Sequence, residues 1–369
     1  MKRVLIAPHK YVQGRDVLDE IGSYLGMLGK NPLILWDQTV QAIVGERVRR
    51  SIQAAQLNWS EAEFAGEATR AECDRVVETA RNRSADCVAG IGGGKVLDIA
   101  KAAAVKLGVR LMTCPTLAST DAPTSAATVW YDEEHNFVGF DCWPFNPDIV
   151  LVDTGVIAQA PVRTFVAGMG DALSTWIEAR AAFESRAPNI AGGRPTMAAM
   201  TLARLCFDTL VEHGREAKRA VELGLVTPAV EKVVEANVLL SGLGFESGGL
   251  ATAHMVANLL SNLPECRTSL LHGEKVGFGI VTQMCLEDEF DPDQRALIVD
   301  FEIDIGLPVT FSELNLGEIS RERLRRIAEA CAAEGSLCRN HPFPVGAEDV
   351  LDAMIDADAL GRERHCIRG

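Results

Sequence analysis

The first 160 residues alternate short apolar runs with stretches of helical periodicity, and this alternation limits the possible fold more than any other feature. The apolar runs predict five β-strands, at Val4–Ala7, Leu33–Trp36, Cys87–Ile91, Leu111–Cys114 and Ile149–Val152. The amphipathic stretches between them predict α-helices at Val17–Leu28, Arg70–Arg81 and Val96–Leu107. Strands that alternate with helices form a mostly parallel sheet covered on both faces. Residues Ala126–Phe145, with a turn at Asp132–Asn136, predict an inserted β-hairpin.

After Pro161 the strand signals fade and helical stretches rich in Ala and Leu take over. The predicted helices are Ala172–Glu184, Pro195–Glu212, Ala229–Leu243, Leu250–Leu260, Val276–Asp288 and Arg321–Ala333. A chain of 369 residues is long enough for two domains. We therefore predict an α/β domain over residues 1–160 and an all-α domain over residues 161–369.

The charge balance and the cysteines restrict the partners and the compartment. With 51 Asp and Glu against 36 Lys and Arg, the net charge of −15 repels phosphate backbones. We therefore expect neither nucleic acid nor an anionic membrane as a partner. No apolar stretch is long enough to span a bilayer, and the N-terminal run is too short for a signal peptide. The ten cysteines are scattered without a CxxC pair, which is typical of buried, reduced thiols in a cytoplasmic protein.

A glycine-rich turn follows one of the buried strands and opens an Ala-rich helix. The run Gly90–Asp98 reads GIGGGKVLD. Glycines let a backbone approach a pyrophosphate closely, and the free N–H groups at a helix start can bind it. Lys95 adds a positive charge. The alternative is a tight strand-to-helix turn without a ligand, because the run is not the usual GxGxxG fingerprint.

Two further strand ends carry polar residues that fit a dinucleotide. Asp37 ends the apolar run at Trp36, where a carboxylate can accept hydrogen bonds from a ribose diol and would repel a 2′-phosphate. It favours NAD over NADP, although a helix cap is the alternative reading. The segment Pro115–Ser125 is dense in hydroxyls, which suits either a ligand loop or an ordinary polar turn. Loops at the carboxyl ends of parallel strands converge on one crevice.

Three side chains of the helical half suit a divalent metal ion. His254 and His272 lie in apolar helical surroundings, and Asp171 is a carboxylate that we place at a helix start. Taken singly, each has an ordinary structural reading, as a hydrogen-bonded core histidine or as a helix cap. Together, one carboxylate and two imidazoles suit zinc with a position left for a substrate oxygen. Such an ion would favour the alkoxide from which an alcohol releases hydride.

Five motifs in order resemble the glycerol dehydrogenases, a family of the iron-containing alcohol dehydrogenase superfamily, which is also similar in fold to dehydroquinate synthase. The motifs are Gly92–Asp98, Pro115–Ser125, Gly168–Ala172, Gly249–His254 and His272–Gly279. The resemblance runs over nearly the whole chain. It implies an N-terminal dinucleotide-binding α/β domain, a C-terminal all-α domain and catalysis in the cleft between them. It also implies a homo-oligomer, often an octamer in similar proteins.

The resemblance further implies hydride transfer from a small polyol, such as glycerol or a related vicinal diol, to NAD. The product would be a hydroxyketone such as dihydroxyacetone. Asp171, His254 and His272 would bind Zn²⁺, with Fe²⁺ as the alternative, and Asp121 would contact the polyol as the catalytic residue. The NAD site would be lined by Asp37, Gly93, Gly94, Lys95, Thr116, Ser119, Ser125, Ala127 and Tyr131.

The chain departs from the family pattern beside the metal ligands, and this leaves the substrate open. Ala257 and Leu259 stand where many members have His and Gly, and Pro264–Leu271 replaces a histidine-rich stretch. An enzyme acting on a phosphorylated substrate, like glycerol-1-phosphate dehydrogenase, or a lyase like dehydroquinate synthase would need several cations near the metal. The motifs offer only Arg267 and Lys275.

Three further questions stay open at this point. A non-catalytic NAD-binding module is the alternative from another class, although such a protein could have lost the metal ligands that are present here. The group that accepts the hydroxyl proton is either Asp121 or a chain of waters. Cys338 and His341 are only a weak hint of a second metal site.

Overall fold

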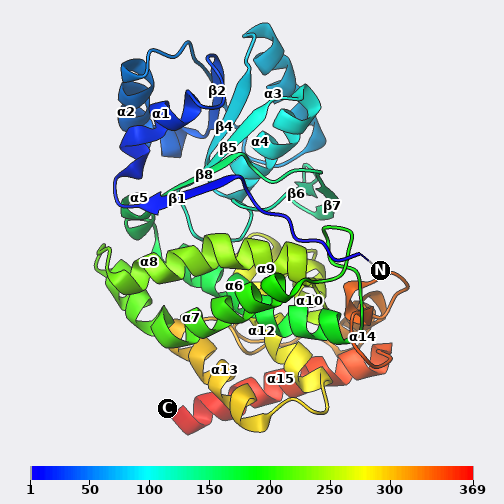
Figure 1. Cartoon of the computed structure of the whole chain (residues 1–369). Coiled ribbons are helices and arrows are strands. Elements are labelled where there is room, and N and C mark those ends of the chain that lie inside the picture. Colours follow the sequence, from blue (N-terminus) through cyan, green and yellow to red (C-terminus); the bar gives the residue numbers. More distant parts are fainter. Residues whose placement is uncertain (1, 369) are drawn as a thin grey trace.

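The computed structural model describes residues 2–368 and is built around a six-stranded parallel sheet with strand order β1-β8-β5-β4-β2-β3 (Figure 1). The strands are β1 (Lys10–Gly14), β2 (Pro32–Trp36), β3 (Ser60–Glu63), β4 (Cys87–Gly92), β5 (Arg110–Pro115) and β8 (Ile149–Asp153). Every neighbouring pair is parallel. The hairpin predicted within Ala126–Phe145 is confirmed as β6 (Ala127–Tyr131) paired antiparallel with β7 (Phe137–Cys142).

Helices cover both faces of the sheet, as the fully buried strands predict. Along β2, Ile34 and Trp36 pack into the core formed with α1 (Ile21–Leu25) and α2 (Gln38–Ala54). Leu33 and Leu35 point the other way, into the core formed with α3 (Arg70–Asn82) and α4 (Gly94–Leu107). Side chains alternate between the two faces of a strand, so a strand buried on both sides must be apolar throughout.

The second half of the chain is helical, as predicted. Its α-helices are α5 (Thr154–Ala158), α6 (Val162–Glu184), α7 (Met197–Glu222), α8 (Pro228–Glu235), α9 (Ser241–Gly248), α10 (Thr252–Leu260), α11 (Pro264–Arg267), α12 (His272–Leu286), α13 (Pro292–Ile305), α14 (Arg321–Cys331) and α15 (Ala347–Arg368). Figure 1 shows them stacked below the sheet. Their core also takes in Val150 and Val152 of β8, so the two halves share buried surface. The predicted boundary at residue 160 falls between α5 and α6.

The first strand is not where the sequence predicted it. Val4–Ala7 forms no strand; it runs along the helical half, where Val4 N donates to Arg194 O and Asn189 Nδ2 donates to Val4 O. The sheet instead begins at β1, whose partner is β8. Strand β3 was missed because its sequence SEAE has no apolar run; it lies at the edge of the sheet beside β2 alone.

Several predicted helix limits also change. Val17–Leu28 breaks into a 3₁₀ turn and the short α1, and Ala229–Leu243 is divided by a π-helical turn at Ala236–Leu240. Helix α6 begins at Val162, ten residues before the predicted start at Ala172. Helix α7 continues through Gly214. A Cβ at this position would lie 2.7 Å from the ring of Phe301, so the glycine allows close packing and does not end the helix. Helices α2, α13 and α15 were not predicted.

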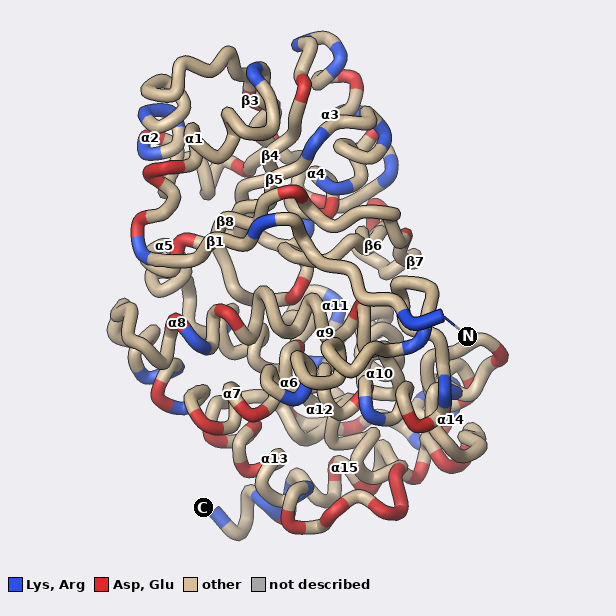
Figure 2. The backbone as a smooth tube through the Cα atoms, viewed as in Figure 1, with Lys and Arg blue, Asp and Glu red and all other residues tan. Residues whose placement is uncertain are grey.

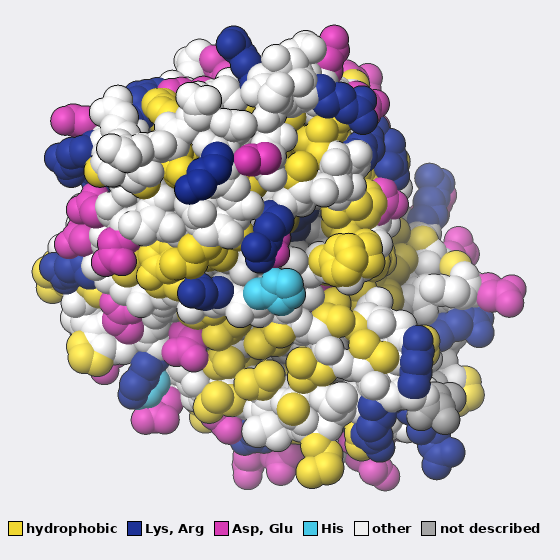
Figure 3. All heavy atoms as spheres, turned by 45° about the horizontal axis from the view of Figure 1, so that its top comes forward, with side chains coloured by type: hydrophobic (Ala, Val, Ile, Leu, Met, Phe, Trp, Pro, Cys, Tyr) yellow, Lys and Arg dark blue, Asp and Glu magenta, His cyan; other side chains and the backbone are white. Residues whose placement is uncertain are grey.

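The molecule carries charged side chains of both signs (Figure 2, Figure 3). Figure 2 shows acidic and basic residues over both halves, with acidic residues gathered around α13 and α15. On the face in Figure 3, cationic and anionic side chains are interspersed, unlike the basic stripe of a nucleic-acid-binding surface. Within residues 2–368, no helix has the length and hydropathy needed to cross a membrane. All ten cysteines are free thiols, and seven of them are buried.

Candidate metal centre and dinucleotide cavity

Loops from three neighbouring strands and residues of the helical half line one cavity of about 870 Å³. Asp37 follows β2, Gly93–Lys95 follow β4, and Thr116 and Ser119 follow β5. Because the strands are parallel, their carboxyl ends meet at the same edge of the sheet. His272 and Lys275 of α12 line the cavity from the helical half.

The glycine-rich turn brings backbone rather than side chains to this cavity. A Cβ on Gly90 would lie 2.6 Å from that of Ala100, so glycine is required for α4 to pack this closely on β4. Gly93 precedes the first residue of α4 and supplies no side-chain cap. The N–H groups of the first helical turn have no partners within the helix and can bind an anion. Lys95 stands beside them, with Nζ 2.6 Å from a Glu67 oxygen and 4.7 Å from the centre of the Tyr131 ring.

Seven of the nine residues predicted to bind the dinucleotide line the cavity: Asp37, Gly93, Gly94, Lys95, Thr116, Ser119 and Tyr131. Asp37 also caps α2 by accepting a hydrogen bond from Val40 N at 2.8 Å, which confirms the helix cap predicted as its alternative role. Ser125 and Ala127 do not line the cavity, and both residues are buried. Ser125 Oγ accepts from Lys101 Nζ at 3.1 Å, and Ala127 pairs with Cys142.

The three predicted metal ligands lie together. Nε2 of His254 is 3.3 Å, and Nε2 of His272 is 3.4 Å, from Oδ1 of Asp171. One potential ligand atom from each residue lies within 4.8 Å of the other two. The prediction that Asp171 starts a helix is wrong: this residue lies inside α6, so its carboxylate caps no helix. The other two side chains come from the first turns of α10 and α12.

Glycines allow the three ligand-bearing helices to approach this closely. A Cβ on Gly273 would lie 1.7 Å from Ala167 O, so α12 touches the backbone of α6 directly beside His272. A Cβ on Gly279 would lie 2.3 Å from Ala253 O, the residue before His254. Backbone atoms cannot yield as a flexible side chain can. The glycines of the sequence motifs therefore determine the distances between the ligands.

The two ligand separations from Asp171 fit one metal ion. Ligands about 2.0–2.1 Å from zinc in a tetrahedral site lie about 3.3 Å apart, which is close to both observed separations. Asp171 Oδ1 is buried and has no hydrogen-bond partner within the described chain. A buried carboxylate oxygen without a hydrogen-bond donor is costly unless a cation balances it. The site residues therefore fit a bound divalent metal.

Glu178, which sequence reasoning missed, orients His254. Its Oε2 lies 2.5 Å from His254 Nδ1, and its Oε1 accepts from the backbone N of His254 at 3.0 Å and of Ala251 at 2.9 Å. A carboxylate on the second imidazole nitrogen leaves Nε2 free for a metal. Glu178 lies two helical turns after Asp171, on the same face of α6. That spacing was a usable signal.

The charges of this cluster depend on one another. Burial alone would raise the pKa of Asp171, but His272 and His254 hold it well below its usual range. Burial would lower the pKa of His254, but Glu178 and Asp171 raise it well above the usual value. These opposing effects are typical of functional sites. The two imidazoles stabilise the charged form of Asp171, as a bound metal cation would.

Asp121, the predicted catalytic residue, connects the cluster to the cavity. Its backbone N donates to Asp171 Oδ2 at 3.2 Å, and its Oδ2 accepts from Ser241 Oγ at 3.2 Å. Burial, with the nearby Asp171 carboxylate, raises the pKa of Asp121 well above its usual value. The residue lines the cavity together with His272. A polar substrate in the cavity can therefore contact both.

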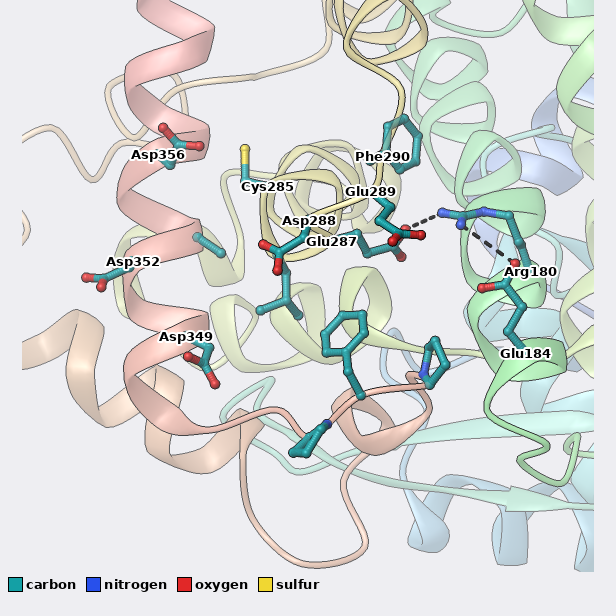
Figure 4. A pocket seen from close by; sticks show the side chains of 15 residues that line it. Arg180, Glu184, Cys285, Glu287, Asp288, Glu289, Phe290, Asp349, Asp352 and Asp356 are labelled. Atoms are coloured by element: carbon teal, nitrogen blue, oxygen red, sulfur yellow. Dashed lines mark hydrogen bonds and ion pairs between the residues drawn. The ribbon is translucent and has the colours of Figure 1, made fainter.

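A second cavity, of about 820 Å³, has a different chemistry and shares no lining residue with the first. Figure 4 shows Asp349, Asp352 and Asp356 spaced along α15, across from Arg180 and Glu184 of α6. Arg180 is already paired with Glu287. This excess of carboxylates repels phosphate groups, so a phosphate-bearing ligand suits the first cavity better than the second.

Comparison with known proteins agrees with the fold. The sequence profile of the iron-containing alcohol dehydrogenases matches residues 8–154. The chain belongs to the iron-containing alcohol dehydrogenase family.

Within it, the chain is 42% identical over 363 residues to glycerol dehydrogenase of Citrobacter freundii, with 98% of this chain and 99% of the relative covered. It is also 42% identical to glycolaldehyde reductase of Halobacterium salinarum, with 98% and 99% covered. The crystal structure of glycerol dehydrogenase from Schizosaccharomyces pombe superposes with a TM-score of 0.95 at 34% identity, with 100% of this chain and 93% of that chain covered.

Proposed function

We propose that this chain is a metal-dependent polyol dehydrogenase that transfers hydride from glycerol or a related vicinal diol to NAD, giving a hydroxyketone such as dihydroxyacetone. One observation carries the proposal: the ligand atoms of Asp171, His254 and His272 lie within 4.8 Å of one another, and His272 lines a cavity that the glycine-rich turn also lines. The full-length similarity to a relative named glycerol dehydrogenase supports it.

The residues of the first half would hold the dinucleotide. The N-terminus of α4 would bind the pyrophosphate at Gly93–Lys95, and Asp37 would accept hydrogen bonds from the adenosine ribose. Thr116, Ser119 and Tyr131 would line the remaining cofactor surface. Ser125 and Ala127 lie behind this surface and would act only by supporting it.

The cluster in the helical half would hold a divalent ion, with Zn²⁺ preferred and Fe²⁺ as the alternative. A nitrogen and oxygen donor set of this kind suits both ions. When bound, the ion would stabilise the alkoxide of the substrate, and the nicotinamide would accept the hydride. The protein supplies orientation: Glu178 holds His254, and Asp121 faces the substrate with a carboxyl group that accepts a hydrogen bond from Ser241.

Several features favour a neutral diol over a phosphorylated substrate. Of the cations that line the cavity, Lys95 is paired with Glu67, which leaves Arg267 and Lys275. A phosphate ester needs more positive charge than this. One relative is named glycolaldehyde reductase. The assay should therefore also include the reverse reaction, the reduction of a small hydroxyaldehyde.

The test is metal analysis of the purified protein before and after chelation, followed by NADH formation with glycerol, 1,2-propanediol and glycerol 1-phosphate. We expect activity with the diols that is lost on chelation and restored by Zn²⁺ or Fe²⁺. Preference for the phosphate ester would overturn the substrate, and full NADH affinity without any metal would indicate a binding module. A homo-oligomer and a cytoplasmic location remain predictions.

A further inference from the structure

Lys275 is a buried cation without a partner. It lines the dinucleotide cavity with only 5% of its surface exposed, yet no carboxylate of the described chain lies within 4.0 Å of Nζ, and its side chain makes no hydrogen bond there. The other deeply buried lysine, Lys101, is fully engaged: Nζ is 2.7 Å from Asp98 Oδ1 and donates to Ala122 O. A buried charge without a partner costs free energy, so Lys275 requires another explanation.

The groups nearest to Lys275 cannot neutralise it. Glu274 accepts from both Arg163 and Leu271 N, and its carboxylate is therefore already engaged. The buried thiol of Cys266 points to Leu314 O. Burial lowers the pKa of Lys275 to about 8; Cys266 and Glu274 oppose this shift, and the like charge of Lys95 adds to it. Two cations at one cavity repel each other unless an anion lies between them.

We propose that Lys275 binds the pyrophosphate of the dinucleotide from the helical half, opposite the turn at Gly93–Lys95. This inference rests on the proposed function, in which the polyol is neutral and the cofactor is the anion that enters the cavity. Lys275 follows His272 by three residues, which places both on the same face of α12. One helix would therefore carry a metal ligand and a cofactor anchor, and the dinucleotide would connect the two halves of the molecule.

The experiment measures the Kd of NADH and of ADP-ribose, by fluorescence and calorimetry, for the metal-loaded wild type and its variants. ADP-ribose keeps the pyrophosphate and lacks the nicotinamide. Lys275→Met keeps most of the aliphatic stem and removes the charge, and Lys275→Arg keeps the charge. We expect the Met variant to bind both ligands about 10- to 100-fold more weakly, as for loss of a charge-assisted hydrogen bond. The Arg variant should recover most of the affinity.

Further measurements distinguish pyrophosphate binding by Lys275 from a structural role and from substrate binding. The thermal midpoint of Lys275→Met should equal or exceed that of the wild type, because an unpaired buried charge has been removed; if this variant does not fold, Lys275→Gln replaces it. Unchanged Kd values for both ligands would overturn the inference. So would a raised KM for the polyol with unchanged nucleotide affinity, since Lys275 would then bind substrate. Failure of the wild type itself to bind NADH would instead overturn the proposed function.

Discussion

Replacing Gly273 by alanine tests whether backbone contact between α6 and α12 holds the metal ligands together. The new Cβ would lie 1.7 Å from Ala167 O, whereas ordinary contact begins at 3.4 Å. Both partners belong to helix backbones, so α12 must retreat by about 1.7 Å, at a cost of roughly 1–3 kcal/mol for overpacking. Alanine otherwise favours a helix over glycine by roughly 1 kcal/mol, so any destabilisation comes from the clash.

The retreat would separate the ligands beyond the reach of one ion. His272 Nε2 and Asp171 Oδ1 are 3.4 Å apart now and would be about 5 Å apart afterwards. Two ligands at about 2.1 Å from zinc can be no more than about 4.2 Å apart even on opposite sides of it. We therefore expect Gly273→Ala to lose its metal, measured by elemental analysis after gel filtration, and with it the dehydrogenase activity.

Gly277→Ala is the matched control, one turn further along α12. Its Cβ would meet Leu307 at 3.6 Å, which is ordinary contact. This variant should keep its metal and gain up to about 1 kcal/mol of stability from the better helix former. If Gly273→Ala keeps one metal ion per chain and a normal kcat/KM, the reasoning from backbone contact is refuted.

Three further predictions concern side chains of the two sites. Glu178→Ala should weaken metal affinity about 10- to 100-fold in a chelator competition, because His254 loses its orienting carboxylate; equal affinity would show that packing alone holds the imidazole. Asp37→Asn keeps a helix cap but removes the charge, so the ratio of kcat/KM for NAD over NADP should fall at least about tenfold, and an unchanged ratio would remove Asp37 from cofactor selection. Burial raises the pKa of Glu246 to about 7. Between the lower pKa of the unfolded state and about pH 7, the folded protein therefore keeps this carboxyl protonated, whereas the unfolded chain has released the proton. This carboxyl therefore destabilises the fold progressively as pH rises towards 7, by about 3 kcal/mol in total. In the Glu246→Gln variant, the free energy of unfolding should fall less between pH 5 and 8 than in the wild type. Parallel pH profiles of unfolding free energy for the two proteins would contradict this.

Features with a local signal could be predicted from the sequence. Strands β2, β4, β5 and β8 are apolar throughout or nearly so, because the sheet is covered on both faces. The glycine-rich turn and the hairpin also lie where their residues indicated. Strand β3 has no such signal, since its SEAE sequence is that of an edge. The apolar run at Val4–Ala7 carried the signal of a strand but packs along the helical half instead.

The residues of the candidate metal site were predicted from donor type and motif, but the residues that support them were not. Asp171, His254 and His272, predicted as metal ligands, lie together although the start of α6 was predicted ten residues late. Glu178 was missed, although its position two helical turns after Asp171 was available from the sequence. Of the predicted cofactor residues, Ser125 and Ala127 lie behind the cavity wall, which their position in a motif does not reveal.

The sequence by itself determined the local elements and the chemistry available to them, because hydrophobic periodicity, turn residues and donor types act over a few residues. Only the tertiary structure decided which groups meet. The separation between Asp171 and His272 is set by the backbone contact at Gly273. The unpaired charge of Lys275 exists only because α12 buries it against a cavity formed by both halves. Distances of this kind depend on how helices pack, and no short stretch of residues encodes them.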